Sequence, residues 1–167
     1  MKLINQTKCP NSILVPLIKH AAMAVRTDLT NVTIKVKQGR SKTERMCGVA
    51  FRDKHGIQHG FEVTLAKCNY CEFDLAGQFW TLLAHELGHI HDYQAEDNGA
   101  KLEWKYWKTE HSQRLMRHDS RPQEIRADGY IENAADRMLS GEIEKGTKQG
   151  LALAIWFAND KMKRDIS

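Results

Sequence analysis

The chain has 167 residues, of which 41% are hydrophobic and 28% charged, and its formal net charge is +4. These values are ordinary for a globular protein, and the length predicts a single domain over residues 1–167 whose core needs no disulfide support. The small positive charge permits nucleic acid as a partner but does not argue for it.

Secretion and membrane insertion are not indicated by the sequence. The first apolar run, residues 13–18, is six residues long and contains Pro16, far short of the roughly 18 residues that span a bilayer. The four cysteines are too scattered to indicate a disulfide framework. We therefore expect no membrane partner and a reducing, cytoplasmic location, and the sequence leaves the oligomeric state open.

The first part of the chain predicts one helix and three strands. The helix has Pro16 in its first turn and runs to about Val25. Apolar and polar residues then alternate over residues 31–37, 48–53 and 61–67, which predicts three half-buried strands. The turn sequence DKHG between the last two strands indicates a hairpin, so we expect a mainly antiparallel sheet.

From about Leu75 onward the apolar residues recur with a helical period, and four helices are predicted. The third is marked by a capping pair, Ser120 with Gln123, and by Gly141 as its C-terminal cap. The four helices cover approximately residues 75–96, 101–118, 120–140 and 148–162. The expected fold class is α+β, with an N-terminal helix, a three-stranded mainly antiparallel sheet, an active-site helix and three further helices.

The first of these helices contains the sequence LLAHELGHIHDY, residues 82–93, which carries an H-E-x-x-H motif. His85 and His89 lie one helical turn apart on the same face, so both imidazoles can bind one metal ion. In this motif Glu86 does not bind the metal but reaches the metal-bound water as general base. The apolar neighbours that would anchor the helix in the core are Leu82, Leu83, Leu87 and Ile90.

A catalytic zinc site has three protein ligands and an open position, so a third ligand must come from elsewhere in the chain. A metzincin would have a histidine at position 95, where this chain has Ala95, and that class is excluded. The strongest candidates are Glu124 as a ligand and Asp128, four residues later on the same helix face, as a hydrogen-bond partner of a ligand histidine. The other candidate ligands are His111, His118, Cys68 and Cys71.

These motifs resemble those of a known group of enzymes. HELGH, followed on a later helix by EIRAD, is similar to the gluzincin branch of zinc metallopeptidases, in which the glutamate of E-x-x-x-D is the third ligand. The size and the order of elements most resemble the minimal metallopeptidase domains of the ImmA/IrrE type. The resemblance implies a zincin-like fold that binds one zinc ion per chain through His85, His89 and Glu124, with Glu86 as the catalytic base and Asp128 as the support of a histidine ligand.

The resemblance covers mainly residues 61–139 and implies hydrolysis of peptide bonds in a protein or peptide substrate. A SprT-like protease is the neighbouring enzyme class. It uses a third histidine as zinc ligand, for which this chain offers His111 or His118.

Peptide hydrolysis needs two further features beside the metal and the base. A donor must stabilise the oxyanion, and His118, Arg126 and Tyr130 are candidates for it. The substrate must also be held, and an extended substrate could pair with the strand over residues 61–67, the last strand before the H-E-x-x-H helix.

The alternative is a zinc-stabilised binding module without turnover. Its basis is the segment over residues 101–118, whose lysines could contact phosphates and whose tryptophans could stack on bases. An amphipathic helix with solvated lysines is the simpler interpretation of that segment. Glu86 favours an enzyme, because a binding module has no need of a base at that position. Cys68 and Cys71 have zinc-knuckle spacing, but no second pair follows, so two free thiols are expected.

Overall fold

The computed structural model describes residues 1–39, 48–54, 58–65, 73–95 and 121–143, with side chains described from Phe79 onward in the helix that begins at Phe73. Over these residues the fold is α+β. The elements, in chain order, are β1 (Lys2–Gln6), α1 (Asn11–Ala24), β2 (Thr33–Gln38), β3 (Gly48–Arg52), β4 (Gln58–Leu65), α2 (Phe73–Gln94) and α5 (Pro122–Leu139).

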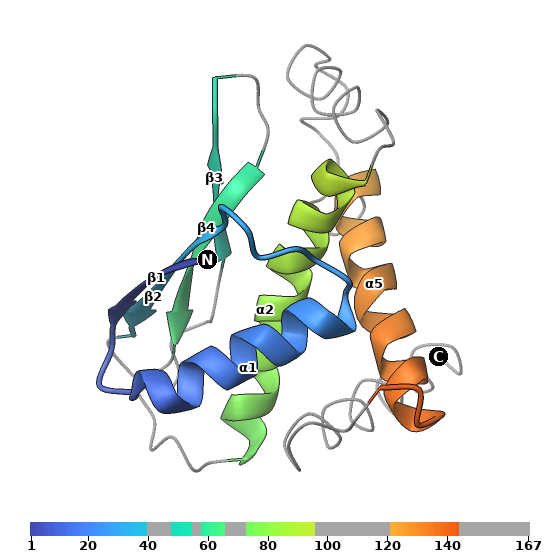
Figure 1. The fold of residues 1–167 in the computed structure, drawn as a ribbon, viewed down its shortest axis with the longest axis horizontal. Helices are drawn as coiled ribbons and strands as arrows, with labels where there is room; N and C mark the ends of the chain where they lie inside the picture. Colours follow the sequence, from blue (N-terminus) through green and yellow to red (C-terminus); the bar gives the residue numbers. More distant parts are fainter. Residues whose placement is uncertain (40–47, 55–57, 66–72, 96–120, 144–167) are drawn as a thin grey trace.

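The strands form one mixed sheet in the order β1-β2-β4-β3 (Figure 1). β2 pairs in parallel with both β1 and β4, whereas β3 and β4 are antiparallel. The predicted sheet of three mainly antiparallel strands is therefore corrected in two respects, the number of strands and the direction of β2. β1 was not predicted because its two apolar residues, Leu3 and Ile4, are adjacent and do not alternate with polar ones.

β4 lies inside the sheet, with β2 on one side and β3 on the other. The strand over residues 61–67, which was expected to receive an extended substrate, is thus paired with β2 as far as Leu65 on one edge and with β3 as far as Val63 on the other. In the part of the sheet that the structure describes, the outer strand on the β4 side is β3.

α1 begins at Asn11, earlier than predicted, and Pro16 lies inside the helix and not in its first turn. Proline removes one backbone hydrogen bond from a helix interior. Leu14, Leu17 and Ile18 are buried on the side of α1 that faces the core, and their burial offsets that loss.

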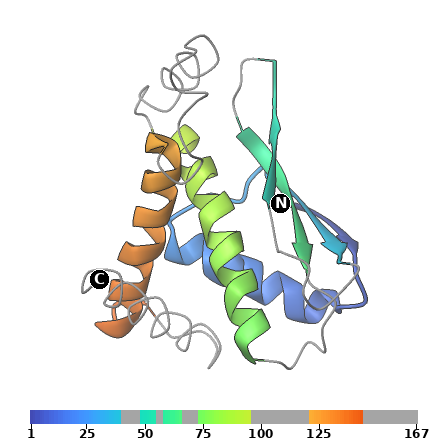
Figure 2. The same cartoon turned by 180° about the vertical axis from the view of Figure 1, so that it is seen from behind.

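Within the described residues, helices α1, α2 and α5 lie on the same side of the sheet, and α2 stands between the sheet and α5 (Figures 1 and 2). α2 contacts α1, α5, β3 and β4. Its apolar side chains Leu83, Leu87 and Ile90 are buried in one core with Phe61 and Val63 of β4. These contacts fix the rotation of α2 about its axis, and with it the direction of its polar residues.

α5 corresponds to the third predicted helix. It begins at Pro122 with Arg121 at the N-cap position, and the predicted cap, Ser120, lies outside the described residues. The helix ends at Leu139, and Gly141 just beyond it has φ of 79°, the left-handed conformation that was predicted for the residue after the helix. The predicted helices over residues 101–118 and 148–162 lie outside the described residues. Among the helices described, none has the length and apolar character needed to cross a membrane.

Candidate metal centre

α2 presents the polar residues of the H-E-x-x-H motif. Glu86 and His89 are each 7% exposed, and His85 is partly buried. Polar side chains are rarely buried at this level unless they are paired or bind a ligand. The cluster is therefore a site that the fold maintains and not a solvated helix face.

α5 brings Glu124 and Asp128 to the same place. Glu124 lies in the first turn of α5, where the helix dipole favours a negative charge, and it is 7% exposed. The two helices approach closely at Gly88, since a Cβ atom there would lie 3.4 Å from the Ala127 Cα atom and 3.2 Å from the Tyr130 ring. Gly129 takes no part in this approach, because a Cβ atom there would meet nothing within 4 Å. Gly88 and Ala127 therefore set the distance between the helices.

Three ligand atoms converge between the two helices. Glu124 Oε2 lies 3.1 Å from His85 Nε2 and 3.3 Å from His89 Nε2, and the two histidine Nε2 atoms are 3.2 Å apart. In a tetrahedral zinc site with bonds of about 2.0 to 2.1 Å, ligand atoms lie about 3.3 Å from one another. The spacing of these donors thus fits one metal ion bound to His85, His89 and Glu124.

His85 is oriented by its second ring nitrogen. His85 Nδ1 lies 2.9 Å from Asp128 Oδ1, which leaves Nε2 to face Glu124 and His89. Burial alone would lower the pKa of His85, but hydrogen bonds to Asp128 and Glu124 and the charge of Glu86 outweigh it and raise the pKa to about 10. In the absence of metal a proton therefore stabilises this cluster, and a metal ion would replace that proton.

Glu86 lies beside the cluster but does not belong to the group of converging ligand atoms. Burial raises the pKa of its carboxyl group, while the neighbouring His89 and His85 act in the opposite direction. Gly48, at the start of β3, approaches Glu86 so closely that a Cβ atom at this position would overlap the carboxylate. The carboxylate is thus confined between α2 and the sheet.

Two of the candidate oxyanion donors form hydrogen bonds with Asp92, which lies three residues beyond His89. Arg126 Nε donates to Asp92 Oδ2 at 2.8 Å, and the Tyr130 hydroxyl donates to Asp92 Oδ1 at 2.5 Å. His91 Nδ1 lies 2.9 Å from the Arg26 carbonyl oxygen, and the His91 ring stacks edge-on against the Tyr130 ring. The third candidate, His118, lies outside the described residues.

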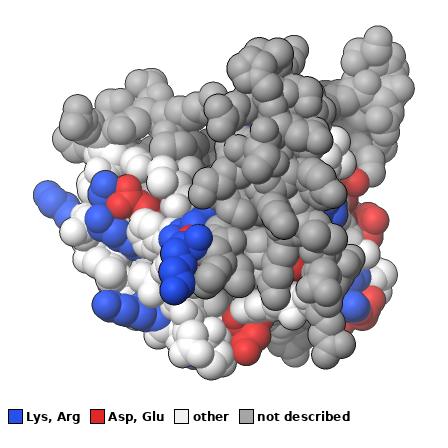
Figure 3. Space-filling view, turned by 90° about the horizontal axis from the view of Figure 1, so that it is seen from above, with Lys and Arg blue, Asp and Glu red and all other residues white. Residues whose placement is uncertain are grey.

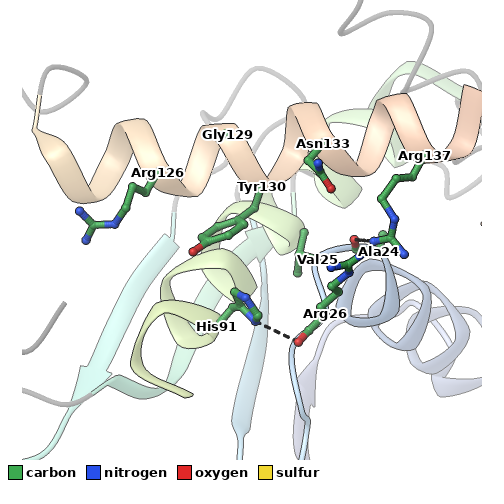
Figure 4. A pocket seen from close by; sticks show the side chains of 9 residues that line it. All are labelled: Ala24, Val25, Arg26, His91, Arg126, Gly129, Tyr130, Asn133 and Arg137. Atoms are coloured by element: carbon green, nitrogen blue, oxygen red, sulfur yellow. Dashed lines mark hydrogen bonds between the residues drawn. The ribbon is translucent and has the colours of Figure 1, made fainter. Parts of the chain in front are cut away.

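This side of α2 borders a separate cavity of about 440 Å³ between α5 and the end of α1 (Figure 4). None of the three converging ligands lines it. Its lining consists of Ala24, Val25, Arg26, His91, Arg126, Gly129, Tyr130, Asn133 and Arg137.

The hydrogen bonds of Asp92 are expected to stabilise the contact between α2 and α5. Asp92→Ala removes a buried acceptor from Arg126 and Tyr130, and we expect it to lower the free energy of unfolding by about 2 kcal/mol. Urea denaturation would measure this loss. Asp136→Ala, which removes an exposed acid from α5, is the control and should change stability by no more than about 0.5 kcal/mol. Equal effects of the two changes would refute the stabilising role of Asp92.

Sequence reasoning did not identify Gly48 or Gln58 as neighbours of the motif. Gly48 begins a strand, and a glycine in that position is a signal of close approach by another group. Gln58 carried no signal, because a lone glutamine at a strand end is ordinary. The candidate ligands His111, Cys68 and Cys71 lie outside the described residues.

Comparisons with protein-family models, with curated proteins and with solved structures found no match to this chain. The chemistry of the site is therefore inferred from its own residues.

Proposed function

We propose that this protein is a zinc-dependent metallopeptidase with a zincin-like fold, which hydrolyses peptide bonds in a protein or peptide substrate. The observation that supports this proposal is the convergence of His85 Nε2, His89 Nε2 and Glu124 Oε2 beside the buried carboxylate of Glu86. Two imidazoles and one carboxylate are a donor set of catalytic zinc sites, which leave one position open for water or substrate.

A bound zinc ion would supply a water of pKa about 7 and would polarise the scissile carbonyl. In that chemistry Glu86 would accept a proton from the attacking water and would deliver it to the leaving amine. Its confinement between α2 and Gly48 limits the directions in which its carboxylate can point.

The remaining residues hold the ligands in position. Asp128 accepts a hydrogen bond from His85 Nδ1 and thereby selects the tautomer whose Nε2 is free to bind metal. The close contact of α2 with α5 at Gly88 keeps Glu124 within reach of both histidines. The sequence resemblance of HELGH and EIRAD to gluzincins of the ImmA/IrrE type agrees with these roles.

We place the substrate along β3. An extended peptide that adds to this strand would pass close to Gly48, and Gly48 lies against Glu86. β4 is less suited to this role because it lies between β2 and β3, which pair with both of its edges as far as Val63.

The alternative, a zinc-stabilised binding module, has less support. Such a module would not need a buried carboxylate like that of Glu86 beside the ligands. Its proposed nucleic-acid segment, residues 101–118, lies outside the described residues. On the face shown in Figure 3, basic side chains gather towards the left of the part of the chain that the structure describes, with a few acidic side chains among them.

Removal and return of metal test the proposed function. The purified protein is stripped with a chelator, and cleavage of unfolded casein and of a peptide library is measured before and after one equivalent of zinc is added. We expect cleavage to disappear on stripping and to return with about one zinc per chain. Zinc binding of that stoichiometry without cleavage of any substrate would favour the binding module, and failure to bind zinc would overturn both.

A further inference from the structure

Gln58, the first residue of β4, carries a buried amide. Its side chain is 2% exposed, and among the residues that the structure describes neither its amide nitrogen nor its amide oxygen has a hydrogen-bond partner. A buried amide without hydrogen bonds destabilises a protein, so such groups are rare and call for an explanation.

An irregularity in the sheet places this side chain. The register between β3 and β4 shifts between Phe51 and Arg52, so that Gln58 lies opposite Arg52 and His59 has no partner on β3. His59 is exposed and Gln58 is buried. A bulge of this kind re-aims side chains, and bulges are common beside active sites. The bulge thus turns the amide of Gln58 inward toward α2.

The group that the amide meets there is Glu86. The Gln58 amide lies near enough to the Glu86 carboxylate to oppose the effect of burial on its pKa, although the two groups do not have the geometry of a hydrogen bond. Gly48 of β3 closes another side of the same carboxylate. Both strands of the β3–β4 hairpin thus contribute to the surroundings of Glu86, one through its backbone and the other through an amide.

We propose that Gln58 is a positioning residue for Glu86. The amide nitrogen of Gln58 donates a hydrogen bond to one carboxylate oxygen of Glu86, and this bond directs the other carboxylate oxygen toward the His85–His89–Glu124 cluster. The proposal rests on the proposed function, because it assigns Gln58 a role in orienting the catalytic base.

Gln58→Met tests the proposal, since methionine has a similar length and volume but cannot donate a hydrogen bond. We expect kcat for casein-derived peptides to fall by about 10- to 100-fold with KM and zinc content unchanged. The melting temperature should not fall, because the variant also removes a buried amide. His59→Met, on the exposed side of the same bulge, is the matched control and should leave all four quantities unchanged. A lower melting temperature with unchanged kcat would show that Gln58 has only a structural role and would overturn the proposal.

A double-mutant cycle separates this proposal from the proposed function, because it needs no substrate. Gln58→Met is introduced into the wild type and into Glu86→Met, and the shift in melting temperature is compared. If the amide and the carboxylate interact, the two shifts should differ by about 2 °C or more. Equal shifts would refute the pairing of Gln58 with Glu86. Unequal shifts in a protein that cleaves nothing would support the pairing and refute the peptidase function.

Discussion

Glu86→Gln is expected to reduce peptide-bond cleavage by about 10³-fold while the protein still binds one zinc ion. Glutamine has the shape of glutamate and can fill the space beside Gly48, but its amide cannot accept a proton from water. Glu86 does not belong to the converging ligand atoms, so its replacement leaves His85, His89 and Glu124 unchanged. The expected phenotype is therefore a folded, zinc-loaded and inactive protein.

Two measurements check this result: zinc content by elemental analysis, and kcat/KM for a peptide that the wild type cleaves. Glu62→Gln is a suitable control, because Glu62 is a carboxylate on β4 whose partners are Lys35 and Lys37. It should retain wild-type activity. Cleavage by Glu86→Gln at a rate within about tenfold of the wild type would show that another group acts as the base.

Glu124→Ala is expected to weaken zinc binding by more than about 100-fold. Removing a residue that only hydrogen-bonds to a metal ligand lowers metal affinity by up to about 100-fold. Glu124 is assigned as a ligand itself, so its removal should lower the affinity further. Its Oε2 atom lies 3.1 Å from His85 Nε2 and 3.3 Å from His89 Nε2, so alanine removes the single donor that α5 contributes to the cluster. Two histidines alone do not hold a catalytic zinc ion.

Competition with a fluorescent zinc chelator would measure this affinity. Asp128→Asn provides a graded comparison, because it alters only the support of His85 Nδ1 and should weaken binding by about 10- to 100-fold. A larger loss of zinc affinity in Glu124→Ala than in Asp128→Asn would distinguish the ligand from the residue that supports a ligand. Unchanged zinc affinity in Glu124→Ala would refute its assignment as a ligand and point to a donor outside the described residues, such as His111, His118 or a cysteine.

The residues of the cluster could be predicted from sequence because each pair lies on a single helix. The spacing of His85 and His89, and that of Glu124 and Asp128, places each pair on one face of a helix, whatever the rest of the fold does. Apolar neighbours then indicate which face is buried. The structure brings His85, His89 and Glu124 together, as the motifs predicted. The number of residues between the two helices did not by itself show that they pack against each other.

The sheet and its part in the site could not be predicted in the same way. Alternation identifies a strand but does not specify its partner, so the parallel pairing of β2 was missed. The positions of Gly48 and Gln58 depend on that pairing and on the register shift next to Arg52. Arg126 and Tyr130 were candidate oxyanion donors, but the neighbour that binds both of them, Asp92, becomes evident only when α2 and α5 are packed together.

The division of the ligands between two helices has a consequence for the chain as a whole. α2 supplies two donors and α5 supplies one, so a metal ion bound by all three would cross-link the chain and close a loop of about 35 residues between His89 and Glu124. Because the site is assembled only when α2 and α5 pack together, the binding free energy of the ion would add to the stability of the folded chain. The ion would thus act as a reversible cross-link that, unlike a disulfide, a reducing environment does not break.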